Sequence, residues 1–262
     1  MPRFACNISM MFEEVEFLDR FARAATAGFR AVEFHEPYAY PKNRLADLVA
    51  EHRLDMALFN LPMGSVPLGE AGIACLPDRK SEFRDGVAQG IDYAQALGCR
   101  QINCLAGIAP TAAARAVLMD VLVENLAYAA GELDRAGMRL MVEPLNARDV
   151  PGFLLTRSSE VIAAIEATGS PNVFLQYDFY HAQVMGEDLA PTLERLLPRI
   201  GHVQFSDNPG RHEPGTGQID FPILFDQLDR LGYRGWVGAE YRPSAGTEAS
   251  LGWYRPYRGR GA

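Results

Sequence analysis

The sequence has few cysteines and no excess of basic residues. Four cysteines occur in 262 residues, Cys6, Cys75, Cys99 and Cys104, and no two of them form a CxxC pair. This usage excludes a disulfide-rich scaffold and predicts reduced, buried thiols in a cytoplasmic protein. Lysine and arginine number 25 against 33 aspartates and glutamates, which gives a formal net charge of -8. That balance argues against a nucleic-acid-binding surface, but a small anionic substrate needs only one or two local cations.

Long apolar segments are also absent. No run approaches the roughly 18 apolar residues that a membrane-spanning helix needs. Residues 1–7 contain neither an apolar run nor a cleavage-site pattern. We therefore expect no membrane span and no signal peptide. With 48% hydrophobic and 22% charged residues, the chain has the composition of an ordinary globular protein of one domain.

A pattern of amphipathic segment, glycine and short apolar run recurs along the chain. Gly28, Gly98, Gly137 and Gly232 each precede such a run. Glycine readily adopts the left-handed conformation that ends many helices, so the pattern predicts helix ends followed by buried strands. Eight strands are expected, which begin near Phe4, Ala31, Met56, Gln101, Arg139, Val173, His202 and Trp236. The clearest helices are expected at 14–27, 81–97, 117–136, 158–168 and 223–231.

The alternation of strands and helices predicts the fold class. Strands that alternate with helices form parallel sheets with right-handed crossovers, and eight such units favour a closed barrel. We predict an α/β fold, a single (β/α)8 TIM barrel domain that covers residues 1–262. An open, doubly wound sheet is the competing fold. It often has a glycine-rich phosphate loop after the first strand, and residues 7–12 contain no glycine.

Polar side chains end four successive strands in the second half of the chain. Glu143 ends the fifth strand, Asp178 the sixth and Glu240 the eighth, and Gln204 lies near the end of the seventh. TIM barrels carry their active sites at the carboxyl ends of the strands, so these groups should converge. Three converging carboxylates repel one another, and a divalent cation would relieve the repulsion. Four oxygen ligands suit Mg²⁺ or Mn²⁺ better than zinc, so we predict one such ion.

Two further residues are candidates for substrate binding. His181 lies three residues after Asp178 and could reach a substrate oxygen, or it could be a histidine at a helix start that bonds to a backbone carbonyl. Arg211 lies in a segment rich in glycine and proline, 206–217. Its guanidinium could form a bidentate bond to a substrate carboxylate, unless it is a solvated loop residue. His202 is expected in the core or behind the ligands, and His35 in a loop or at the surface.

Several longer motifs resemble the hydroxypyruvate isomerase family of xylose isomerase-like TIM barrels. They are Asn60-Leu61-Pro62, Gly72-Ile73-Ala74-Cys75, Glu143-Pro144-Leu145-Asn146, Val150-Pro151-Gly152-Phe153, Tyr177-Asp178-Phe179-Tyr180-His181, and Asp207-Asn208-Pro209 through Gly217. The resemblance extends over nearly the whole chain. It implies an isomerase that interconverts hydroxypyruvate and tartronate semialdehyde through a metal-stabilised cis-enediolate. It also implies that Glu143 and Glu240 are the catalytic pair and that both, with Asp178 and Gln204, hold the metal.

Two segments depart from the family pattern. Gly64-Ser65-Val66 stands where the family usually has Gly-Asp-Trp, and His35-Glu36 is unusual after the second strand. Both segments are expected in loops that face the substrate, so they bear on the exact substrate more than on the reaction type. A 2-oxo-tetronate isomerase shares the Met1-Pro2-Arg3-Phe4 start and the Arg211-His212-Glu213-Pro214 run, and it stays an alternative.

Other classes of function are less well supported. A ketose 3-epimerase of the same superfamily uses the same chemistry, but tagatose 3-epimerase-type sites have a histidine where this chain has Gln204. A multi-zinc phosphodiesterase such as endonuclease IV needs many histidines, and this chain has five. A catalytically dead sugar-binding barrel would be expected to lose one of the strand-end residues. We predict a small anionic sugar-acid substrate, no nucleic acid and no membrane partner, and a homo-oligomer is compatible with the sequence.

Overall fold

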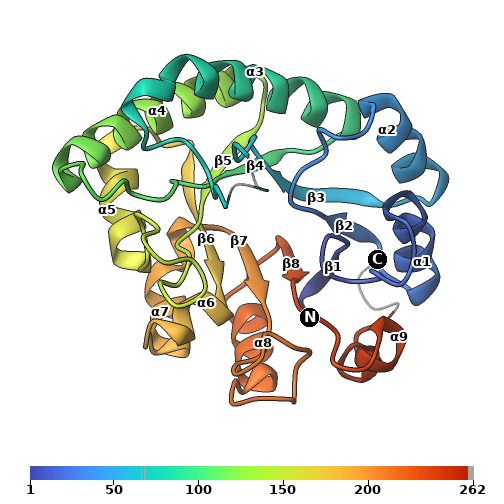
Figure 1. The fold of residues 1–262 in the computed structure, drawn as a ribbon. Coiled ribbons are helices and arrows are strands. Elements are labelled where there is room, and N and C mark those ends of the chain that lie inside the picture. The colour runs from blue at the N-terminus through green and yellow to red at the C-terminus, as the bar shows by residue number, and fades with distance from the viewer. Residues whose placement is uncertain (66, 68, 259–262) are drawn as a thin grey trace.

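The computed structural model describes residues 1–65, 67 and 69–258, and it is a closed barrel of eight parallel strands (Figure 1). The strands are β1 Arg3–Asn7, β2 Ala31–Glu33, β3 Asp55–Asn60, β4 Gln101–Cys104, β5 Arg139–Val142, β6 Val173–Asp178, β7 Ile200–Phe205 and β8 Trp236–Ala239. Strand β8 pairs with β1 and closes the barrel. The predicted fold is confirmed, and each strand begins at or close to its predicted position. Val66 and the end of the predicted domain, residues 259–262, lie outside the described residues.

Helices surround the strands, as Figure 1 shows. The α-helices are α1 Arg20–Ala27, α2 Lys42–Glu51, α3 Lys80–Leu97, α4 Arg115–Arg135, α5 Ser158–Thr168, α6 Phe179–Val184, α7 Leu189–Leu196, α8 Phe221–Arg230 and α9 Thr247–Ser250. Short 3-10 helices are η1 Phe17–Asp19, η3 Pro77–Arg79, η4 Leu197–Arg199 and η5 Leu251–Tyr254. None of the described helices has both the length and the apolar composition that crossing a membrane requires.

The first helix begins later than the sequence predicts. A helix was expected from residue 14, but η1 begins at Phe17 and α1 at Arg20. The carboxylate of Glu14 accepts hydrogen bonds from the backbone N–H and the hydroxyl of Thr247, at 2.6 and 3.1 Å. Glu14 therefore ties its segment to the C-terminal part of the chain instead of starting the helix. The predicted helix ends at Gly28 and Gly98 are confirmed, since both glycines are left-handed, with φ of 97° and 66°.

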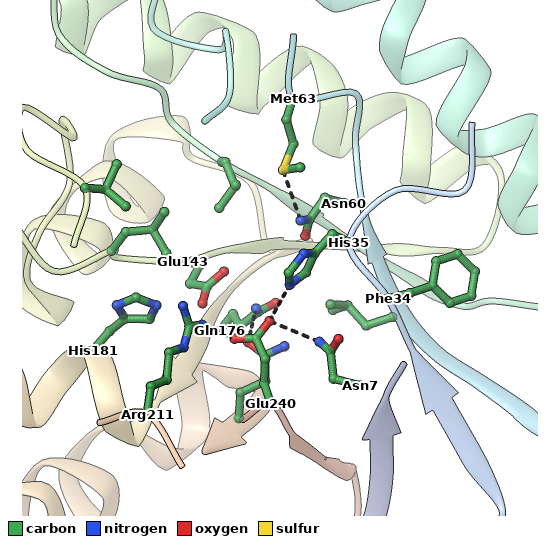
Figure 2. A pocket seen from close by; sticks show the side chains of 15 residues that line it. Asn7, Phe34, His35, Asn60, Met63, Glu143, Gln176, His181, Arg211 and Glu240 are labelled. Atoms are coloured by element: carbon green, nitrogen blue, oxygen red, sulfur yellow. Dashed lines mark hydrogen bonds and ion pairs between the residues drawn. The ribbon is translucent and has the colours of Figure 1, made fainter. Parts of the chain in front are cut away.

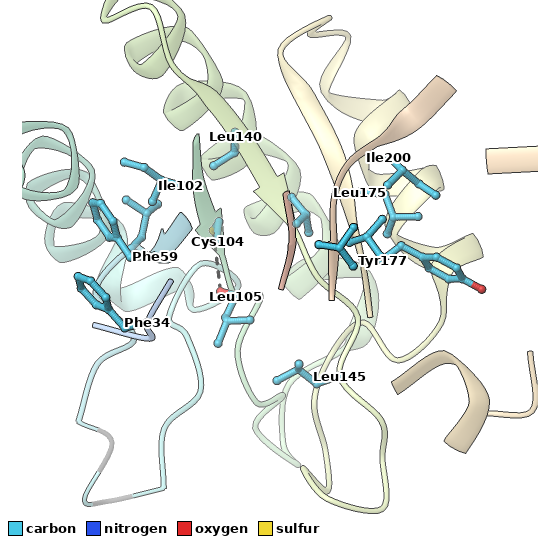
Figure 3. Packing of buried hydrophobic residues seen from close by; sticks show 14 of the residues in the cluster. Phe34, Phe59, Ile102, Cys104, Leu105, Leu140, Leu145, Leu175, Tyr177 and Ile200 are labelled. Carbon is cyan, nitrogen blue, oxygen red and sulfur yellow. Dashed lines mark hydrogen bonds between the residues drawn. The ribbon is translucent and has the colours of Figure 1, made fainter. Parts of the chain in front are cut away.

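Successive residues along a strand pack in two different hydrophobic clusters. In β1, Phe4 and Cys6 belong to the large hydrophobic core, whereas Ala5 packs in a separate small cluster with Ala31 and Ala57. Figure 3 shows part of the large core, including Phe34, Phe59, Ile102, Leu140 and Leu175. Each fully buried side chain of this kind contributes about 1.5–3 kcal/mol to stability. The large core packs the strands against the surrounding helices. Other buried strand positions carry polar side chains, such as Glu33, Gln176 and His202.

Candidate active site

The four residues predicted to end the strands converge at one end of the barrel. Strand register places Asp178 directly beside Gln204, and Glu143 and Glu240 immediately follow β5 and β8. One carboxylate oxygen each from Glu143, Asp178 and Glu240 and one ring nitrogen of His181 lie within 4.8 Å of one another. Figure 2 shows the side chains of Glu143, His181 and Glu240 directed toward the same space. The tertiary structure thus brings the predicted groups together.

A small cavity opens between these side chains. Its volume is about 130 Å³, below the roughly 300 Å³ at which pockets for drug-sized ligands begin. Both polar and apolar side chains line it, among the latter Leu58 and Leu145. The lining consists of Asn7, Phe34, His35, Leu58, Asn60, Met63, Leu105, Glu143, Leu145, Val150, Gln176, His181, Gln204, Arg211 and Glu240. The cavity therefore suits a polar molecule of a few carbon atoms.

Glu240 is surrounded by hydrogen-bond donors. Its Oε1 accepts from Asn7 Nδ2 at 3.0 Å and lies 2.8 Å from His35 Nε2. Its Oε2 accepts from Arg211 Nη2 at 2.6 Å. Burial alone would raise the pKa of Glu240, but the charge of Arg211 and the hydrogen bond from His35 outweigh it and lower the pKa to about 2. Glu240 is therefore ionised at neutral pH.

Glu143 and Asp178 have the opposite electrostatic environment. Burial, followed by the negative charges of Glu240 and Asp178, raises the pKa of Glu143 well above its usual range. Asn103 Nδ2 donates to Glu143 Oε2 at 2.9 Å, and this one bond does not offset the burial. Burial and the charge of Glu240 raise the pKa of Asp178 to about 7. The pKa values of the two predicted catalytic carboxyls are thus shifted in opposite directions, so the site favours the protonated form of Glu143 and the ionised form of Glu240.

The carboxylate cluster fits a divalent cation. Oδ1 of Asp178 accepts the backbone N–H of Tyr180 at 2.7 Å. Oδ2 of Asp178 is buried, and within the described part of the chain it has no hydrogen-bond partner. Three buried carboxyls that repel one another, with one oxygen unpartnered, provide the donor set that hard cations such as Mg²⁺ and Mn²⁺ prefer. Glu143, Asp178 and Glu240 are the residues that could hold such an ion.

Gln204 lies beside this cluster with its amide engaged on both sides. Its Nε2 donates to Glu33 Oε1 at 2.7 Å, and its Oε1 accepts from Gln176 Nε2 at 2.5 Å. An amide oxygen has a second lone pair, so the contact with Gln176 leaves room for a metal bond. The role of Gln204 as a metal ligand stays a prediction.

His181 is oriented as a hydrogen-bond donor to the cavity. Its Nδ1 accepts from the backbone N–H of Asn146 at 3.1 Å and lies 2.7 Å from the side-chain nitrogen of Asn146. Its Nε2 lies 3.7 Å from Asp178 Oδ2. Burial, together with the charge of Arg211, lowers the pKa of His181 to about 3, so the ring is neutral. A neutral imidazole has a single acceptor nitrogen, so Nε2 carries the hydrogen and can donate to a substrate oxygen but cannot bind a cation.

The loop after β7 directs Arg211 into the cavity. Arg211 has a left-handed backbone, with φ of 57°, and its side chain is 20% exposed. In the part of the chain that the structure describes, its Nε is buried without a hydrogen-bond partner. Asp207 holds the loop in shape because its carboxylate accepts backbone N–H groups of Asn208, Gly215, Gly217 and Ile219 at 2.8–3.1 Å. Arg211 is therefore a fixed residue of the cavity wall, not a solvated one.

The sequence analysis missed several residues of the site. The expectation that His35 lies in a loop is confirmed, but its place in the site was missed, because it lines the cavity and contacts Glu240. Asn7 ends β1 and Asn60 ends β3, and both line the cavity. Asn103 lies in β4 and donates to Glu143. The sequence carries the same signal for two of them, because Asn7 and Asn60 are also polar residues at the ends of buried strands. The expected core position of His202 is confirmed, since it is fully buried.

Known proteins resemble this chain over its full length. The family model described as xylose isomerase-like TIM barrel matches residues 21–257. The chain is 47% identical to hydroxypyruvate isomerase of Escherichia coli (strain K12), over 98% of this chain and 100% of that protein. It is 45% identical to 2-oxo-tetronate isomerase of Cupriavidus necator, over 99% and 100% of the two chains. A solved structure titled AP endonuclease, family 2, from Brucella melitensis superposes with a TM-score of 0.96 at 43% identity, over 98% of this chain and all of that one.

Proposed function

The chain belongs to the xylose isomerase-like TIM barrel family, and on this premise we propose that it interconverts hydroxypyruvate and tartronate semialdehyde. Its relatives make it an isomerase that acts on sugar acids. The main support for this reaction is that Glu143 and Glu240 both line one small cavity and that their pKa values are shifted in opposite directions. An isomerase that moves a carbonyl between neighbouring carbons needs one group that accepts a proton and one that donates it.

The proton transfers follow from the chemistry of the substrate. Hydroxypyruvate has a ketone at C2 and a hydroxymethyl group at C3. Removal of a proton from C3 gives a cis-enediolate whose negative charge lies on the C2 oxygen. Return of a proton to C2, with transfer of the hydroxyl proton from the C3 oxygen to the C2 oxygen, gives tartronate semialdehyde. We assign removal of the C3 proton to Glu240, whose environment favours the ionised form, and return of the proton to Glu143, whose environment favours the protonated form. The reverse reaction uses the opposite protonation states.

Arg211 and two histidines can bind the substrate, and Arg211 also influences the pKa of Glu240. Arg211 has a buried Nε that can meet the substrate carboxylate. When Arg211 shares its charge with the substrate, Glu240 loses part of the stabilisation that lowers its pKa, so it becomes a stronger base. His181 and His35 can donate to the substrate oxygens. Glu143, Asp178, Gln204 and Glu240 would hold Mg²⁺ or Mn²⁺, and the bound ion would stabilise negative charge on the oxygens of the enediolate.

Localisation and partners follow from simpler features. All four cysteines are free and buried, which suits a reducing compartment, and we infer a cytoplasmic protein. The net charge of -8 makes nucleic acid an unsuitable partner. The partner that we propose is therefore a small anionic sugar acid.

A substrate panel tests the proposal. Purified protein loaded with Mg²⁺ or Mn²⁺ is assayed with hydroxypyruvate, 2-oxo-tetronates and ketohexoses. We expect the highest kcat/KM with hydroxypyruvate. The alternative, a 2-oxo-tetronate isomerase, is favoured by the 45% identity to the Cupriavidus necator protein. A clear preference for a 2-oxo-tetronate would establish it, and a preference for ketohexoses would make the chain an epimerase-type enzyme.

Replacement of Arg211 by lysine should weaken substrate binding more than turnover. Lysine keeps the charge but loses the planar fork that meets a carboxylate with two hydrogen bonds. A lost charge-assisted hydrogen bond costs about 1.5–3 kcal/mol, so KM for hydroxypyruvate should rise by roughly 10- to 150-fold. His181→Asn should act in the same direction.

The matched control for this experiment is Arg242→Lys. Arg242 is exposed, and its backbone N–H, rather than its side chain, contacts Arg211. Steady-state kinetics of the three variants separate KM from kcat. An unchanged KM with a large fall in kcat for Arg211→Lys would show that Arg211 acts on the chemical step and not on binding.

A further inference from the structure

A line of hydrogen bonds crosses the inside of the barrel from its base toward the cavity. Arg139 Nη2 donates to Gln101 Oε1 at 2.6 Å. Gln101 Nε2 lies 3.1 Å from His202 Nδ1, and His202 Nε2 lies 2.8 Å from Glu33 Oε2. These residues belong to β5, β4, β7 and β2, and the last two strands are not neighbours in the barrel. The contact of His202 with Glu33 therefore passes through the barrel interior.

Each hydrogen bond in this line has a defined direction. Arginine only donates, so the oxygen of the Gln101 amide must face Arg139. The NH₂ group of Gln101 then faces His202 and donates to Nδ1. An imidazole that accepts at Nδ1 carries its hydrogen on Nε2, so His202 donates to Glu33. Arg139 at the base thus sets the tautomer of a histidine inside the barrel.

Glu33 receives donors on its other oxygen as well. Oε1 accepts from Gln204 Nε2 at 2.7 Å and from Asn7 Nδ2 at 3.2 Å. The side chain of Glu33 is completely buried. A Cβ atom at Gly238 of β8 would lie 2.3 Å from Oε1, so this glycine leaves the space that the carboxylate fills. Within the described part of the chain, the three polar side chains that contact the Glu33 carboxylate all act as donors, so both of its oxygens act as acceptors.

We propose that Glu33 is a positioning residue that determines which end of the Gln204 amide faces the cavity. Because Glu33 accepts only, it holds the NH₂ group of Gln204, and the oxygen faces Gln176, which also lines the cavity. Glu33 also holds Asn7, whose Nδ2 donates to Glu240 at 3.0 Å. The inference rests on the proposed function, because the orientation of the Gln204 oxygen matters when that oxygen binds the ion.

Glu33→Gln should disturb this arrangement even though it changes the size of the side chain little. The new amide has one donor end, and every neighbour of position 33 is itself a donor. Whichever way the amide turns, its NH₂ group meets the hydrogen on His202 Nε2 or the amides of Gln204 and Asn7. The simplest relief is rotation of Gln204, which would turn its NH₂ group toward the ion.

Arg139→Met offers a rescue that a merely structural role of Glu33 would not produce. Without Arg139 the Gln101 amide is free to turn and present its oxygen to His202. His202 can then carry its hydrogen on Nδ1 and accept at Nε2 from the new amide at position 33. In the double variant all neighbours of position 33 are satisfied again, and Gln204 can return to its original orientation.

Isothermal titration of the full-length protein with Mn²⁺ tests the proposal. Removal of a residue that orients a metal ligand lowers metal affinity by about 10- to 100-fold, which we expect for Glu33→Gln. The double variant should recover at least part of this loss, and Arg139→Met alone should lose far less. Asn125→Ala is the control, because Asn125 is fully buried but bonds to the carbonyl of Ala74, away from the site. It should destabilise the fold and leave Mn²⁺ affinity near that of the wild type.

The tautomer of His202 gives a second, independent readout. In the wild-type protein, ¹⁵N NMR of the labelled imidazoles should show the hydrogen of His202 on Nε2. A hydrogen on Nδ1 or a doubly protonated ring would overturn the proposal even if Glu33→Gln fails to fold. Mn²⁺ affinity that is unchanged in Glu33→Gln, or no better in the double variant, would do the same. If the wild type binds Mn²⁺ but isomerises no sugar acid, the proposed function fails, and these measurements still decide the role of Glu33.

Discussion

Glu240→Gln and Glu143→Gln should each abolish isomerisation while the fold remains intact. Glutamine preserves the size of the side chain and one carbonyl oxygen, but it cannot accept and return a proton at neutral pH. Groups that act as general acids or bases contribute on the order of 10² to 10⁴ in rate, and lost metal affinity would add to this. The expected fall in kcat is therefore at least about a hundredfold for either variant.

Exchange of the C3 hydrogen of hydroxypyruvate with deuterated water is the decisive measurement for these variants. It reports proton abstraction even when product does not accumulate. Glu248→Gln, at an exposed position of α9, is the matched control and should exchange at the wild-type rate. Thermal melts with saturating Mn²⁺ check the fold of each variant. Near wild-type rates of both exchange and isomerisation in either Glu143→Gln or Glu240→Gln, with metal present, would exclude the two-carboxylate mechanism.

Removal of divalent metal should eliminate activity, and Mn²⁺ or Mg²⁺ should restore it. Asp178→Asn should not be restored at the metal concentration that suffices for the wild type, because the cluster loses one of its charges. The pKa of Asp178 is raised to about 7, so the ion must displace a proton from that carboxyl at and below neutral pH. Protonated carboxyls compete with the metal, so affinity should fall as the pH falls.

Titration calorimetry measures this competition directly. Below the pKa of Asp178, each displaced proton lowers metal affinity by about tenfold per pH unit. We therefore expect weaker Mn²⁺ binding at pH 6 than at pH 8. The observed heat should depend on the ionisation enthalpy of the buffer, since protons are released. Activity that survives exhaustive chelation, or affinity that is independent of pH, would contradict a metal site at these carboxylates.

The local pattern of the sequence was sufficient for the fold and for one half of the site. Buried strands such as β5 and β8 are recognisable because apolar residues follow a helix-ending glycine, and the polar residue that ends each strand is visible in the same pattern. Glu143, Asp178, Gln204 and Glu240 could be proposed in this way because parallel strands in a barrel end at the same face. The start of α1 could not be predicted in this way, because Glu14 bonds to Thr247, which is 233 residues away in the sequence.

The tertiary structure alone decided how these groups are charged, oriented and paired. His35 and Arg211 both bond to Glu240, whereas burial and the neighbouring carboxylates raise the pKa of Glu143, and this difference depends on which side chains meet across the barrel. The direction of the hydrogen bonds from Arg139 to Glu33 is likewise a property of four strands together. Periodicity along the chain reports burial because burial repeats with the local backbone geometry. A pKa or a donor direction depends on neighbours that are distant in sequence, and these become defined only when the barrel closes.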